Sequence, residues 1–85
     1  MERLYRLIEE KIKASGYPGE INGAEFFADV SEEVETREPG SYVFLIKKSD
    51  TVLYQGTVDI LDDQMDLHTV DIHENGQVWH VDFDA

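Results

Sequence analysis

Asp71, His73, His80 and Asp82 lie close together near the C-terminus and are of types that could bind a metal or transfer protons. The Asn75-Gly76 dipeptide between them is a strong hairpin signal, because both residues of a two-residue turn need positive φ. The pairing that this turn imposes sets Asp71 opposite His80 on one face of the hairpin. Neutral histidine and carboxylate are competent ligands for zinc or nickel, so a small metal-binding protein or an uncharacterised enzyme is one hypothesis.

The spacing of these residues favours a plainer interpretation. Six residues separate His73 from His80, which matches no metal-binding signature. Histidine and aspartate also meet across strands as ordinary surface pairs. We therefore predict no metal and no cofactor, and we interpret Asp71, His73, His80 and Asp82 as an acidic, histidine-bearing surface.

His68 requires a separate interpretation, because the same strand pairing turns it inward beside Phe83 and Val58. A histidine on an apolar face is typically neutral and hydrogen-bonded to backbone, and burial lowers its pKa. A catalytic base needs a nucleophile or an acidic partner in reach, and the pairing implies none. We predict no catalytic residue here.

The acidic turn at residues 59–66 invites a calcium hypothesis, since calcium takes oxygen ligands. It lacks the Asp-x-Asp-x-Asp-Gly spacing of a calcium-binding loop. The chain also contains no cysteine, no glycine-rich phosphate loop and no nucleophile elbow. These observations favour a protein that is not an enzyme.

Four alternating apolar runs must position these side chains, at residues 42–48, 52–61, 67–73 and 77–84. Runs of this length separated by turn residues predict a four-stranded antiparallel meander in the order 1-2-3-4. A three-residue loop at 49–51 pairs Phe44 with Gly56, and a connection through 61–65 pairs Val58 with His68. The predicted core face is Tyr42, Phe44, Ile46, Val52, Tyr54, Val58, Ile60, His68, Val70, Ile72, Trp79, Val81 and Phe83.

Two helices are predicted before the strands. Residues 2–15 carry an apolar stripe opposite a charged face, and Gly16 suits the left-handed position that ends a helix. Asn22 as N-cap, followed by Glu25, marks a second start, and an apolar stripe runs from Phe26 to Val34. We predict a single α+β domain over residues 1–85, with both helices packed on one face of the sheet.

Four aliphatic residues then point away from the helices: Val43, Leu45, Leu53 and Val78. Two helices can cover only one face of four strands, and an apolar set left on the other face is typical of a protein interface. The first and last strands of a meander are also free edges, so edge pairing is a second route to a dimer.

The net charge of −12 is concentrated after residue 20, and residues 49–85 contain nine acidic residues and neither Lys nor Arg. Such a field repels nucleic acid and attracts basic proteins. No run approaches the ~20 apolar residues of a membrane span, and the start lacks the apolar segment of a signal peptide, so we predict a cytoplasmic protein without membrane contact.

The sequence thus predicts a non-enzymatic interaction module or small regulatory protein. Its partner would be a protein of basic character, or a second copy in a homodimer. The alternative is an acidic mimic that occupies the nucleic-acid site of a basic DNA- or RNA-binding protein.

Overall fold

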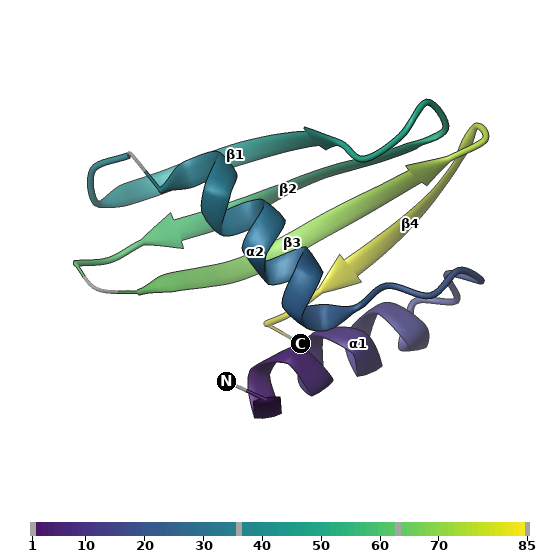
Figure 1. The fold of residues 1–85 in the computed structure, drawn as a ribbon, viewed down its shortest axis with the longest axis horizontal. Helices are drawn as coiled ribbons and strands as arrows, with labels where there is room; N and C mark the ends of the chain where they lie inside the picture. The colour runs from purple at the N-terminus through teal and green to yellow at the C-terminus, as the bar shows by residue number, and fades with distance from the viewer. Residues whose placement is uncertain (1, 36, 63, 85) are drawn as a thin grey trace.

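Two helices precede four antiparallel strands in a single open sheet (Figure 1). The structure is a computed structural model, and it describes residues 2–35, 37–62 and 64–84. The elements are α1 (Glu2–Ala14), α2 (Gly23–Val34), β1 (Gly40–Lys47), β2 (Val52–Ile60), β3 (Met65–Glu74) and β4 (Gln77–Asp82). The strand order β1-β2-β3-β4 confirms the predicted α+β meander.

The end of α1 and the start of α2 lie where local chemistry directs them. Gly16 adopts φ +92° just after α1, in the left-handed region that glycine tolerates. The side-chain oxygen of Asn22 accepts a hydrogen bond from the backbone N–H of Glu25 at 2.9 Å, which confirms it as the N-cap of α2.

The two helices cross closely at the start of α2. A Cβ atom on Gly23 would lie 2.1 Å from the carbonyl oxygen of Tyr5, so only glycine fits this crossing. The N–H of Gly23 donates to the Glu9 carboxylate at 2.7 Å, and this carboxylate therefore also satisfies the N-terminus of α2. Neither contact is visible from the pattern of either helix alone.

The pairing of β1 with β2 follows the predicted register. Phe44 lies opposite Gly56, and the N–H of Lys48 donates to the carbonyl of Val52 at 2.9 Å, leaving residues 49–51 as the loop. A Cβ atom at Gly56 would lie 2.7 Å from the Phe44 ring, so the ring occupies the space that this glycine leaves.

The pairing of β2 with β3 departs from the prediction. Thr57 pairs with Thr69 as expected, but Val58 pairs with Leu67, so His68 is an extra residue in a β-bulge. The connection is also one residue shorter than predicted, because Leu61 N–H donates to the Gln64 carbonyl at 2.8 Å and closes a four-residue loop. The predicted pairing of Val58 with His68 is therefore wrong.

The apolar pattern of β3 explains this bulge. Met65 and Leu67 pack against the core, as do Val70 and Ile72. Leu67 and Val70 are three positions apart in the sequence, and strict alternation cannot turn both side chains inward across an odd spacing. One inserted residue shifts the alternation, and His68 leaves the core face as Leu67 enters it.

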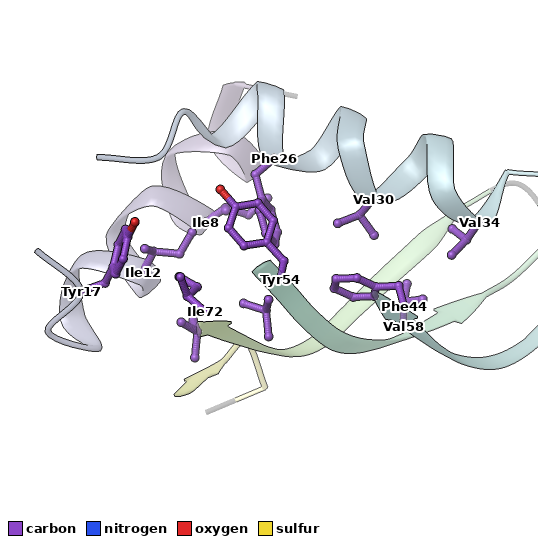
Figure 2. Packing of buried hydrophobic residues seen from close by; sticks show 12 residues of the cluster. Ile8, Ile12, Tyr17, Phe26, Val30, Val34, Phe44, Tyr54, Val58 and Ile72 are labelled. Atoms are coloured by element: carbon purple, nitrogen blue, oxygen red, sulfur yellow. The ribbon is translucent and has the colours of Figure 1, made fainter. Parts of the chain in front are cut away.

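The core lies between the helices and the sheet (Figure 2). Ile8 and Ile12 of α1 and Phe26, Val30 and Val34 of α2 are buried against it. Apart from His68, every residue of the predicted core face belongs to this cluster, either buried or packed against it. No helix among the described residues is long and apolar enough to cross a membrane.

Candidate functional site

The sheet face turned away from the helices carries all of the predicted site residues, and we call it the outer face. The strand register arranges it in rows. The rows are Lys47, Leu53, His73 and Val78; then Leu45, Gln55, Asp71 and His80; then Val43, Thr57, Thr69 and Asp82. The predicted interface and the predicted acidic surface are therefore one surface, with no helix over it in the described chain.

The Asp71–His80 pair forms as the hairpin register requires. The Nδ1 atom of His80 lies 2.5 Å from the Asp71 carboxylate, and the His80 side chain is 61% exposed. A polar side-chain contact this accessible to water contributes under about 1 kcal/mol to stability. Its geometry is that of a surface contact.

His73 is set differently, between Leu53 and Val78 in its row. Its Nε2 atom is buried and has no hydrogen-bond partner within the described residues. Most buried polar atoms have a hydrogen-bond partner, so this nitrogen is an exception in the described part of the chain. In residues 2–35, 37–62 and 64–84, no group of three or more His, Asp or Glu is placed to hold a metal ion.

The structure places His68 between two carboxylates, which sequence reasoning missed. Its Nε2 lies 2.8 Å from the Asp59 carboxylate and its Nδ1 lies 2.8 Å from that of Asp84. The Ser41 hydroxyl donates to the other oxygen of Asp59 at 2.6 Å. We call His68, Asp59 and Asp84 the His68 clamp.

The clamp reverses the predicted ionisation of this histidine. Hydrogen bonds to Asp59 and then to Asp84 raise the pKa of His68 to about 9, against the opposing effect of desolvation. Hydrogen bonds from Ser41 and then from His68 lower the pKa of Asp59. The prediction of a buried neutral histidine with a lowered pKa is wrong, because the bulge carries the ring out of the core to two acids.

The chemistry open to the clamp is limited. A doubly protonated imidazole whose two N–H groups both donate has no lone pair for a substrate proton or a metal. Asp59 lies on β2 and Asp84 follows β4, so the clamp joins the sheet to the segment after β4. The backbone N–H of Phe83 also donates to the His68 carbonyl at 2.8 Å. His68 therefore acts as a structural cation.

A hollow of about 710 Å³ opens beside the clamp, between the helices and β3. Apolar side chains dominate its wall: Leu4, Leu7, Ile8, Phe27, Met65, Leu67 and Phe83. Its polar groups are largely engaged, because Gln64 donates to Asp66 at 3.1 Å and His68 binds Asp84. The hollow resembles an apolar groove more closely than a reaction centre.

Two further polar contacts tie the helical layer to the sheet. The Lys48 ammonium lies 2.5 Å from Glu25 and 2.7 Å from Asp29 of α2, and hydrogen bonds to Asp29 and then to Glu25 raise its pKa. The Tyr17 hydroxyl donates to Glu74 at 2.7 Å, and burial followed by this bond raises its pKa to about 12. Both contacts are structural.

The apolar residues of the outer face are largely accessible to solvent. Val43, Leu45 and Val78 are 61%, 56% and 54% exposed, while Leu53 is half-buried. Among the described residues, Asp71 and Asp82 share this face with Lys47, and Asp59 is already bonded to His68. The surface therefore combines exposed aliphatic groups with carboxylates.

No family model matches this chain, and comparison with curated proteins and with solved structures gives no match. Its function has to be inferred from its own surfaces.

Proposed function

We propose that this chain is a non-enzymatic interaction module whose outer face binds a basic protein. The observation that carries the proposal is the uncovered face of a four-stranded sheet on which three aliphatic side chains are more than half exposed. The solvated face of an antiparallel sheet is ordinarily polar. Aliphatic groups ringed by polar ones are typical of a surface that a partner covers.

Charge supports a basic partner. The chain carries a net charge of −12, and fifteen of its nineteen acidic residues follow residue 20. Asp71 and Asp82 stand on the outer face itself, in the same rows as Leu45 and Val43. A partner with Lys or Arg around an apolar centre would meet complementary charge at the rim and apolar contact within.

The state of the histidines supports a role without catalysis. His68 has both ring nitrogens engaged by carboxylates, and His80 is paired with Asp71 at the surface. The Nε2 atom of His73 has no partner in the described structure, and its two direct cross-strand neighbours, Leu53 and Val78, are aliphatic. Aliphatic neighbours supply neither a proton nor a charge to this ring, so His73 does not form a catalytic pair in its row.

An acidic mimic of nucleic acid is the second candidate function. The nine acidic residues in 49–85, with neither Lys nor Arg among them, favour it. A mimic would bind through carboxylates alone and would lose affinity steeply as salt rises. The outer-face proposal expects a weaker salt dependence, because apolar contact supplies part of the affinity.

Affinity capture with matched variants tests the proposal. The immobilised chain is compared with a Leu53→Ser, Val78→Ser double variant, and Leu61→Ser serves as control because Leu61 is 46% exposed and lies outside the outer face. Captured proteins should be lost from the double variant and kept by the control, with circular dichroism verifying that each variant is folded. Equal capture by all three chains would contradict the proposal.

Salt dependence then separates the two candidates. The dissociation constant of the captured protein is measured as ionic strength rises, for the native chain and for an Asp71→Asn, Asp82→Asn variant. A moderate salt effect with loss of binding in the Leu53→Ser, Val78→Ser variant supports the outer face. A steep salt effect with no response to the aliphatic changes supports the mimic.

A further inference from the structure

The outward edge of β1 is free along the described length of the strand. β1 is the first strand of the sheet order, and Figure 1 shows α2 over its core side and no element beyond its edge. The N–H of Lys48 bonds to Val52 of β2. In an antiparallel ladder, alternate residues face the neighbour, so the backbone groups of Ser41, Val43, Leu45 and Lys47 point away from β2.

This edge lacks the features that normally prevent pairing. Natural edge strands are short, bulged, interrupted by proline or charged along their length. β1 has eight residues and a continuous register with β2, and Lys47 at its end is its only charged residue. At its centre, Val43 and Leu45 are 61% and 56% exposed.

The opposite edge is better protected. β4 has six residues and presents His80 and Asp82 on the outer face. α1 packs against β4, and in the segment that follows α1 the Tyr17 ring meets Trp79 edge to face, with 5.2 Å between the ring centroids. Of the two edges, β1 is the one open to another strand.

Charge identifies the kind of strand that fits. Residues 39–49 contain no acidic residue and two lysines, and no other stretch of the chain is as long without an acid. A basic partner would be drawn to the acidic surfaces instead of this edge. For two copies of a chain with charge −12, β1 is where they can approach with least repulsion.

We propose that two copies of this chain pair antiparallel through β1, with Phe44 on the twofold axis, to form a continuous eight-stranded sheet. In this register Val43 lies opposite Leu45 of the partner subunit, and the outward backbone groups of both residues bond to each other. Ser41 lies opposite Lys47 of the partner subunit, so the two lysines do not face one another.

The pairing is self-complementary on both faces of the sheet. Val43 and Leu45 from both copies form one aliphatic row on the outer face. On the core face, Tyr42 lies opposite Ile46 of the partner subunit, and both side chains are only half-buried in the single chain. Both copies therefore use the same surface, and each contact occurs twice, once in each direction. This is the isologous arrangement of twofold dimers.

Substitutions on β1 test whether this strand forms the dimer interface. Val43→Pro removes an N–H that points away from β2, so it blocks edge pairing while leaving the β1–β2 ladder intact. Leu45→Lys introduces two like charges at the centre of the interface and serves as a second variant if the proline variant does not fold. Val78→Lys is the matched control, because Val78 is 54% exposed on the same face but lies on β4.

Sedimentation equilibrium of the full chain over a concentration series gives the result. The native chain and Val78→Lys should dimerise with association rising with salt, since salt screens the repulsion between two acidic chains, while the β1 variants remain folded monomers. A native chain that stays monomeric at high salt overturns the proposal. So does a dimer that survives both β1 changes, or one that Val78→Lys abolishes. Salt should strengthen self-association of the chain but weaken binding of a basic protein. The dimer proposal and the proposed function can therefore be refuted independently of each other.

Discussion

The His68 clamp makes the stability of the fold depend on pH in a direction that the sequence did not predict. The pKa of His68 in the folded chain, about 9, lies above the ordinary value of 6.5. The clamp therefore stabilises the fold fully below about pH 6.5, and this stabilisation is lost as pH rises through about 9. Without screening, such a shift corresponds to roughly 3 kcal/mol. The imidazole is 34% exposed, and solvent screening reduces the expected contribution to about 1 kcal/mol.

The assay compares urea unfolding of the native chain and of His68→Gln between pH 6 and pH 10. The native chain should be more stable by about 1 kcal/mol at the acid end, and the difference should shrink toward the alkaline end. His80→Gln serves as the control, because its pair with Asp71 is exposed at the surface. NMR titration of the His68 ring gives the direct reading, and a midpoint at or below 6.5 would refute the clamp.

Three further changes test the packing. Gly56→Ala would put a methyl group 2.1 Å from a β3 carbonyl oxygen and 2.7 Å from the Phe44 ring, so urea unfolding should show a loss of about 3 kcal/mol, and a loss under ~0.5 kcal/mol would contradict the register. Trp79→Ala removes a half-buried ring against Tyr17 and should cost roughly 2 to 3 kcal/mol by circular dichroism melting, whereas an unchanged melting temperature would place the ring outside the core. Asn22→Ala removes the cap of α2 and should cost about 1 kcal/mol in the same measurement, and a neutral result would mean that the cap is unimportant.

Local patterns were sufficient to predict most of the architecture. Asn75 and Gly76 both adopt positive φ, at 51° and 81°, and the hairpin that they form sets Val70 against Val81 as predicted. Gly56 likewise determines the register of β1 with β2, because only a residue without a side chain leaves room for Phe44 opposite it. Alternation and turn chemistry act between near neighbours, and a sequence displays them directly.

The bulge was missed although the sequence contains its signal. The three-residue spacing from Leu67 to Val70 conflicts with two-residue alternation, and we expected His68 to face the core because the alternation was continued through it. Once that residue is displaced, its ring reaches acids nine residues before it and sixteen after it. Contacts of this range depend on where the whole sheet ends, which no local pattern specifies.

Contacts between layers were unpredictable for the same reason. Gly23 fits under the Tyr5 carbonyl only because α1 and α2 cross at that point, and Tyr17 meets Glu74 only because the loop after α1 reaches the β3–β4 hairpin. The outer-face residues were easier to place. Alternation alone assigns Val43 and Leu45 to one side of β1, and the structure leaves that side uncovered.

The most direct test of the outer face is an NMR titration of the isotope-labelled chain with the basic protein that it captures. Amide and methyl shifts should change at Leu53, His73 and Val78, in the row where His73 has a buried Nε2 without a described partner, while α1 and α2 stay unperturbed. Changes confined to the helices, or to the hollow lined by Leu4, Leu7 and Phe83, would contradict the proposal and place the binding surface on the opposite side of the sheet.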